Sequence, residues 1–190
     1  MGEIVVVRHG QTEWSAAGRH TSTTDLDLTS AGEDGAKSLS RVLANRAFVA
    51  VMSSPRRRAR RTAELAGLVV TEVDNDIAEW DYGTYEGRST SEIHAEAPGW
   101  DLWREGCPGG ETPEQVTVRL DRFITKLRPM LVLGDVAVTS HGHASRALAA
   151  RWLEQPIAFG AHLTLGTATI SVLGHEHDAP SLRLWNAPPV

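Results

Sequence analysis

The chain has 190 residues, of which 41% are hydrophobic and 23% are charged, values typical of a globular protein with one sizeable core. Its formal net charge of −5 argues against a general nucleic-acid or acidic-membrane binder. The one cysteine, Cys107, cannot form an intrachain disulfide, and no apolar run approaches the length of a membrane span. We therefore expect a cytoplasmic protein with a single domain over residues 1–190.

The first predicted element is a buried strand over Ile4–Val7, because all four residues are apolar and β-branched residues favour strands. The apolar run stops at Arg8-His9-Gly10. A strand of an α/β sheet delivers side chains to a crevice at its carboxyl end. There Arg8 offers a fork of donors suited to phosphate, and His9 can act as nucleophile, base or metal ligand.

A polar loop follows over Ser15–Leu28 and is expected to line the same crevice. Thr29 is a good cap for a helix over Ala31–Asn45, which carries an apolar stripe at helical spacing. Phe48–Met52 is the next predicted buried strand.

Ser53-Ser54-Pro55 is predicted to open a helix, with the proline near its first turn. Five arginines then stand between Arg56 and Arg61. This run invites a nucleic-acid interpretation, but it is short, the chain is acidic, and no aromatic residues are interleaved with it. A solvated helix face explains most of these arginines.

The segment from Glu79 to Gly87, Glu-Trp-Asp-Tyr-Gly-Thr-Tyr-Glu-Gly, mixes aromatic, acidic and glycine residues. Such a mixture after a strand is more typical of a functional loop than of a structural one, and a carboxylate there can serve as a general acid. A short helix is expected over Ser89–Ala97 and a Trp- and Gly-rich loop over Pro98–Glu111.

Thr112-Pro113-Glu114-Gln115 is a strong helix start, with a threonine cap, proline at the first position and a capping box. The helix is expected to run to about Arg128 and to end at Pro129. The next buried strand, Asp135–Thr139, ends in Ser140-His141-Gly142-His143, so a second strand delivers imidazoles to its carboxyl end. A helix over Ala144–Glu154 follows.

Leu163–Leu165 and Thr167–Leu173 are predicted to lead into a final pair of strands, with Ser181–Trp185 as the partner. His175-Glu176-His177-Asp178 lies in the turn between them. A His-x-His turn can bind metal, but no third ligand is evident nearby, and we do not predict a metal site.

Four motif blocks occur in the order in which one known family carries them. They are Arg8-His9-Gly10-Gln11-Thr12-Glu13-Trp14, Ser54-Pro55 followed by Arg58-Ala59, the loop that begins at Glu79, and Ser140-His141-Gly142. With them the chain resembles the histidine phosphatase superfamily, in its phosphoglycerate mutase-like branch. The resemblance implies a three-layer α/β/α sandwich with a mostly parallel central sheet flanked by helices.

The resemblance also implies roles. His9 attacks phosphorus and becomes phosphohistidine, while Arg8, Arg58 and His141 hold the phosphoryl oxygens. Glu79 protonates the leaving group. No cofactor and no metal are expected. Further substrate contacts are expected from the loops around these residues, namely from Gly10, Gln11, Ser15, Thr21, Ser22, Tyr82, Arg104 and Gly142.

The motifs are most similar to those of actinobacterial acid phosphatases and fungal sedoheptulose bisphosphatases, which favours a small phosphorylated metabolite, such as a sugar bisphosphate, as substrate. The loop after His9 departs from the family pattern. The family often has Asn at Ser15, Gln-Gly at Thr21-Ser22 and Pro at Asp27, so the detail of substrate contact differs there.

Other functions stay open at this point. A cofactor-dependent phosphoglycerate mutase is the nearest, although this chain is shorter than typical mutases. A non-catalytic binding module is disfavoured because His9, Arg58, Glu79 and His141 are all present. A nucleic-acid binder rests on Arg56–Arg61 alone. Homodimers are common among members of the family, but no surface stripe demonstrates one.

Overall fold

A computed structural model describes residues 1–189 and contains six strands in one sheet, in the order β3-β2-β4-β1-β5-β6. β3 (Glu72–Val73), β2 (Phe48–Ser53), β4 (Asp135–Ser140) and β1 (Ile4–Arg8) run parallel to one another. β5 (Ile170–Glu176) and β6 (Ala179–Ala187) complete the sheet in antiparallel fashion. The expected α/β sandwich with a mostly parallel sheet is therefore confirmed.

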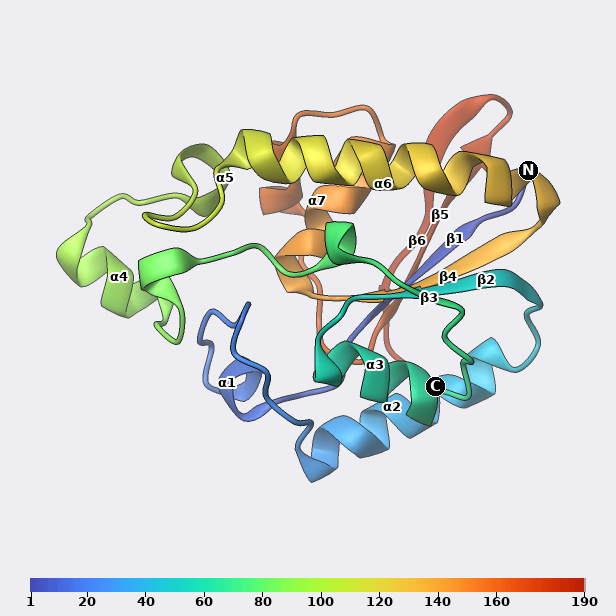
Figure 1. Cartoon of the computed structure of the whole chain (residues 1–190), viewed down its shortest axis with the longest axis horizontal. Helices are drawn as coiled ribbons and strands as arrows, with labels where there is room; N and C mark the ends of the chain where they lie inside the picture. The colour runs from blue at the N-terminus through green and yellow to red at the C-terminus, as the bar shows by residue number, and fades with distance from the viewer. Residues whose placement is uncertain (190) are drawn as a thin grey trace.

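Helices cover both faces of this sheet (Figure 1). The long helix α6 (Pro113–Leu133) and α7 (Gly142–Trp152) lie on one face, and α2 (Ser30–Leu43) and α3 (Arg57–Leu65) lie on the other. The remaining helical segments are short and belong to the connections: α1 (Glu13–Ala16), η1 (Asn75–Ile77), η2 (Gly83–Tyr85), α4 (Thr90–Glu96), α5 (Leu102–Glu105) and η3 (Ile157–His162).

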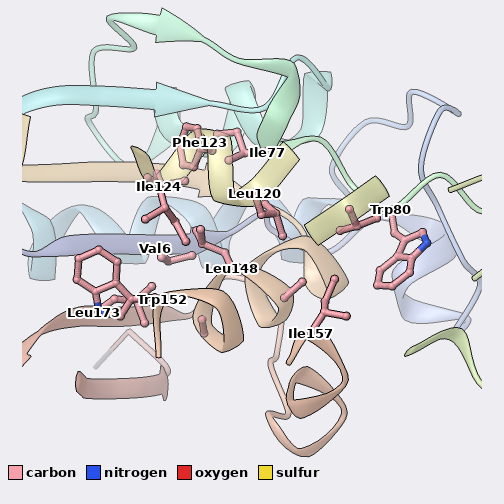
Figure 2. Packing of buried hydrophobic residues seen from close by; sticks show 14 of the residues in the cluster. Val6, Ile77, Trp80, Leu120, Phe123, Ile124, Leu148, Trp152, Ile157 and Leu173 are labelled. Carbon is pink, nitrogen blue, oxygen red and sulfur yellow. The ribbon is translucent and has the colours of Figure 1, made fainter. Parts of the chain in front are cut away.

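The residues of β1 alternate between two hydrophobic clusters because successive side chains of a strand point to opposite faces. Ile4 and Val6 belong to the cluster beneath α6 and α7, and Val5 and Val7 belong to the cluster beneath α2 and α3. Figure 2 shows Val6 within the larger cluster, together with Phe123 of α6 and Leu148 of α7. β1 is thus buried on both sides, as its unbroken apolar run predicts.

The register of the central strands determines where the site can form. Val7 of β1 pairs with Thr139 of β4, and Arg8 pairs with Ser140. The residues that follow, His9 and His141, therefore leave the sheet side by side at the carboxyl ends of the strands. In Figure 1, α1 and α4 lie at this end of the sheet.

Several predicted boundaries need correction. Pro129 lies inside α6, which continues to Leu133. The proline is exposed, so water can bind the carbonyl that its missing N–H leaves free, while Leu127 and Leu131 stay buried on the core face. Pro55 precedes the helix instead of standing in its first turn, because Arg56 is the N-cap residue of α3.

Two loops also differ from the prediction. The loop after His9 begins with the short helix α1, which Thr12 caps by accepting a hydrogen bond from the Ser15 N–H. Leu163–Leu165 form no strand but follow η3, and the Leu165 carbonyl instead accepts a hydrogen bond from Arg8. Across residues 1–189, no helix is both long and apolar enough to cross a bilayer.

The packing of α6 on the sheet generates a stability prediction. Phe123 is fully buried in the larger cluster, so Phe123→Ala is expected to lower the free energy of unfolding by about 3–5 kcal/mol through lost burial and a residual cavity. Urea denaturation measures this. The control is Val118→Ala on the same helix, where the side chain is 62% exposed and a change within about 0.5 kcal/mol is expected. Equal losses in both variants would contradict the assigned core face.

Candidate active site

Two imidazoles lie at the centre of the site, one from each central strand. The ring centroids of His9 and His141 are 5.2 Å apart, with the ring planes inclined by 62°. Both side chains are buried, with 4% and 0% of their surface exposed. The parallel pairing of β1 and β4 accounts for this meeting of residues that are 132 positions apart in the chain.

His9 is held in one tautomer by its own backbone turn. Its Nδ1 lies 2.7 Å from the carbonyl oxygen of Gly10, and a carbonyl can only accept, so Nδ1 carries the proton. In the neutral ring the lone pair is then on Nε2. This leaves a nitrogen able to attack an electrophile.

The surroundings of His9 keep the ring neutral. Burial lowers the pKa of His9 well below its ordinary value of 6.5, and the positive charges of Arg8 and Arg58 lower it further. The hydrogen bond to Gly10 acts in the opposite direction but is the smaller effect. His9 therefore keeps its nucleophilic form when the pH falls below 6.5.

Backbone carbonyls hold the two guanidinium groups beside His9. Arg8 donates through Nη1 to the Leu165 carbonyl. Arg58 is fully buried and donates to the carbonyls of Thr21, Ser22 and Thr24 at 3.0–3.2 Å. Within residues 1–189, neither guanidinium lies within 4 Å of a carboxylate. Burial lowers the pKa of both arginines, although they stay cationic at neutral pH.

Three buried donor atoms around His9 lack an acceptor in the protein: Nε of Arg8, Nε of Arg58 and Nδ1 of His141. Orphaned buried polar atoms are costly and indicate a ligand or strain at the place where they gather. For His141 the partner on the other side is known, because its Nε2 lies 2.6 Å from the Ser54 hydroxyl. The hydroxyl can donate to Nε2 and so leave the proton on Nδ1. Each of the three atoms then carries a hydrogen that no acceptor among residues 1–189 takes.

Glu79 is fastened to the start of α7. Its Oε1 accepts from the N–H groups of Trp80 and Ala144, and its Oε2 accepts from the N–H of His143, at 2.8–3.1 Å. The N-terminus of a helix has free N–H groups and a positive dipole end, which suit a carboxylate. Glu79 is also buried, with 6% of its surface exposed.

A brace from α6 fixes the loop that carries Glu79. The carboxylate of Glu111 accepts from the Asp81 N–H and from both Nε and Nη2 of Arg119, and its carbonyl accepts from the Trp80 indole. Arg119 also donates to the carbonyl of Ala78. The residues on either side of Glu79 are therefore bound to a rigid helix, which limits the positions open to its carboxylate.

A cavity of about 260 Å³ opens over these groups. We call it the His9 cavity. Of the residues expected from the sequence, Ser15, Thr21, Tyr82 and Gly142 line it together with Arg8, His9 and Glu79. His141 and Arg58 do not line the cavity, but the ring of His141 packs against His9 and the charge of Arg58 acts on it.

Three of the expected substrate contacts do not line the cavity and instead contact other segments of the protein. A Cβ on Gly10 would come within 2.3 Å of the Gly32 carbonyl, so Gly10 is needed where the backbone passes α2. Gln11 accepts from the Thr29 hydroxyl. Ser22 offers its carbonyl to Arg58, while the carboxylate of Glu86 accepts the Ser22 N–H.

Arg104 lies elsewhere. Its side chain is 81% exposed and its nearest carboxylate is Asp101 of the same turn, so the structure does not bring it to the His9 cavity. Arg146 of α7 lines the cavity instead, with its guanidinium 4.9 Å from the Trp103 ring centroid.

Sequence reasoning also missed Arg19, His20 and Thr90, which line the same cavity. A signal for Arg146 was present in the sequence. His143 and Arg146 are separated by three positions, so they lie on the same face of a helix that begins at Gly142, directly after the strand that ends at Ser140.

Among residues 1–189, no three His, Cys, Asp or Glu side chains gather in a way that could hold a metal ion.

Comparison with known proteins agrees with this geometry. The model of the histidine phosphatase superfamily (branch 1) matches residues 4–188. An acid phosphatase of Mycobacterium tuberculosis is 41% identical over 181 residues, covering 94% of this chain and 89% of its own. The sedoheptulose 1,7-bisphosphatase of Saccharomyces cerevisiae is 37% identical over 180 residues, covering 78% and 66%. A solved structure of an open reading frame from M. tuberculosis superposes with a TM-score of 0.96 at 39% identity and covers 100% of this chain and 99% of its own.

The buried imidazoles make stability depend on pH. Burial and neighbouring positive charge lower the pKa values of His9, His141 and His143 well below 6.5. Below about pH 6.5 the unfolded chain binds protons on these rings and the folded chain does not. The free energy of unfolding should therefore decrease as the pH falls from about 7.5 to about 5.5, by up to about 1.4 kcal/mol per pH unit for each histidine.

Urea denaturation across this range measures the slope. His143→Gln should reduce the slope, because one buried imidazole is lost. His162→Gln is the control and should leave the slope unchanged, because the His162 side chain is exposed in the folded state. A slope that is unaffected by His143→Gln would contradict the prediction.

Proposed function

The chain belongs to the histidine phosphatase superfamily, and we propose from this premise that it is a metal-independent phosphatase of small phosphorylated metabolites that works through phosphohistidine on His9. One observation carries the proposal. Three buried donors without acceptors, on Arg8, Arg58 and His141, surround an imidazole whose Nε2 lone pair is free. Such a set suits an anion that His9 can attack.

In the first step the phosphoryl group of the substrate occupies the place where these donors converge. Arg8 and Arg58 neutralise the oxygens that become equatorial in the transition state, and the neutral ring of His141 donates a hydrogen bond to them. Because carbonyls and not carboxylates hold the guanidiniums, their positive charge is available to the substrate. The free N–H of Gly142 at the start of α7 adds a further donor.

The chemistry is a double displacement. The Nε2 lone pair of His9 forms a bond to phosphorus as the bond to the ester oxygen breaks, and Glu79 gives that oxygen a proton. Water then attacks phosphohistidine, the Glu79 carboxylate takes a proton from the water, and the bonding pair returns to Nε2. The products are one alcohol and one inorganic phosphate.

The substrate is proposed to be a small phosphomonoester, of the kind an acid phosphatase or a sugar bisphosphatase takes. The names of the two relatives support this class, and the volume of the His9 cavity, about 260 Å³, suits a metabolite. The cytoplasmic location, the single domain and the homodimer stay predictions.

The experiment that tests the function is phosphate release from a panel of p-nitrophenyl phosphate, 3-phosphoglycerate, sedoheptulose 1,7-bisphosphate and fructose 1,6-bisphosphate, with EDTA present. Release with one clear favourite would support the proposal and name the class. Isomerisation of phosphoglycerate without release, dependent on added bisphosphoglycerate, would identify a mutase and contradict it.

His9→Ala should reduce phosphate release by more than about a thousandfold, because the nucleophile is lost. Wild-type protein quenched during turnover of ³²P-labelled substrate should carry label that is stable to base and labile to acid, and the variant should carry none. His162→Ala, at an exposed position, is the control and should keep both activity and label. Full activity in His9→Ala would refute the mechanism.

Glu79 generates a pH prediction. In the proposed mechanism, the proton that Glu79 delivers arrives with the substrate monoanion. The second pKa of a phosphomonoester is about 6. The kcat/KM should therefore fall about tenfold per pH unit above that value, while neutral His9 supports activity on the acid side.

Glu79→Gln tests this assignment. It should remove the alkaline decline and lower kcat/KM for an alkyl phosphate by about 10²–10⁴-fold. An aryl phosphate, whose phenolate can leave without a proton, should lose less. Identical losses with both leaving groups would show that Glu79 is not the acid.

A further inference from the structure

His143 is not assigned any role by the phosphohistidine mechanism, although it lines the His9 cavity. It is the second residue of α7, and its backbone N–H donates to Oε2 of Glu79. The imidazole lines the same cavity as the proposed acid, and we expect the alcohol part of a substrate on this side, because the acid protonates its oxygen. We call His143, Tyr82 and His20, which line this side together, the His143 wall.

The hydroxyl of Tyr82 lies 2.6 Å from Nδ1 of His143. Tyr82 is 1% exposed, and no second partner of its hydroxyl occurs among the described residues. If Nδ1 donated, the phenol proton would be left buried without an acceptor, which is costly. The phenol therefore donates and Nδ1 accepts.

This direction of donation determines the tautomer. With Nδ1 as acceptor, the neutral ring carries its proton on Nε2. Burial raises the pKa of Tyr82 well above 10, so the phenol keeps its proton. Burial and the charges of Arg146 and His20 lower the pKa of His143 well below 6.5, so the imidazole stays neutral.

The His143 ring lines the cavity, and its Nε2–H group is the polar group of the ring that Tyr82 leaves free. Within residues 1–189 it has no hydrogen-bond partner, and it is not among the orphaned atoms that are sealed from solvent. The ring cannot readily turn away, because Trp103 packs against it at 5.5 Å between centroids. His20 stacks on Tyr82 at 4.7 Å and holds the phenol in turn.

We propose that the Nε2–H of His143 donates a hydrogen bond to a hydroxyl oxygen on the alcohol part of the substrate, and that Tyr82 is the residue that positions it. The His143 wall thereby selects phosphates of polyhydroxylated alcohols over simple alkyl or aryl phosphates. This inference rests on the proposed phosphatase function and specifies the class of its substrate.

Two probes that differ only in hydroxyl groups test the selection: glycerol 1-phosphate and propyl phosphate. The wild type should favour glycerol 1-phosphate in kcat/KM by about tenfold, the value of one hydrogen bond to a neutral group. His143→Leu, which keeps the bulk of the side chain but removes the donor, should bring the ratio close to one. His143→Gln, whose amide can still donate, should retain most of it, and His162→Gln is the distant control.

Tyr82→Phe tests positioning, because it removes only the hydroxyl. It should lower the ratio less than His143→Leu does, since either tautomer becomes accessible. The double variant Tyr82→Phe/His143→Leu should show no more loss than His143→Leu alone, because Tyr82 acts through His143. Additive losses in the double variant would overturn the positioning role of Tyr82.

The tautomer has a readout that is independent of activity. Two-bond ¹H–¹⁵N correlation spectra of ¹⁵N-labelled protein should show His143 protonated at Nε2 in the wild type and a mixture of tautomers in Tyr82→Phe. A proton on Nδ1 would overturn the inference. An equal loss of kcat/KM with both probes in His143→Leu would also overturn the inference. It would mean that His143 donates its hydrogen bond to the phosphoryl group, which both probes share. A wild type inactive on both probes would refute the phosphatase proposal instead.

Discussion

The site depends on one constraint, the parallel pairing of β1 with β4. Arg8 and Ser140 stand opposite each other in the register, so His9 and His141 leave the sheet at the same level. A shift of one residue would turn every side chain of β1 to the other face. Because β1 is buried on both sides, its register is restrained by both hydrophobic clusters, and so is the distance between the two imidazoles.

The second feature is positive charge that makes no direct ion pair within residues 1–189. Arg8 and Arg58 are held by backbone carbonyls, which orient the guanidiniums, and Glu79 acts on both charges only from a greater distance. Buried cations in this state are costly, and the lowered pKa values of both arginines and of His9 express that cost. The same arrangement suits the phosphate anion of the proposed substrate, so the cost in the free protein and the proposed affinity for phosphate have one cause.

The third feature is the fixed position of Glu79, the proposed acid, relative to the His143 wall. Glu111 and Arg119 hold the loop around Glu79, and α7 offers N–H groups to the Glu79 carboxylate. The same turn of α7 carries His143, whose ring Tyr82 orients. The start of α7 thus holds the proposed acid through its backbone N–H groups and carries the side chain that we propose to contact the alcohol.

The amino-acid sequence by itself determined the central strands, most helices and most of the residues that gather at the His9 cavity. Apolar runs that end in Arg8-His9-Gly10 and Ser140-His141-Gly142 identify two strand ends, and local chemistry is sufficient for that. Local chemistry was not sufficient to predict that α6 continues through Pro129. The helix can continue there because the proline lies on an exposed face, where water can bind the carbonyl that lacks an N–H partner. Nor could local chemistry choose between arginines for the cavity. Arg104 and Arg146 have the same chemistry, but packing turns Arg104 to solvent and lays Arg146 against Trp103. Tertiary structure decided which side chains face the ligand, because the direction of a side chain depends on helix phase and loop path, which contacts between distant segments set.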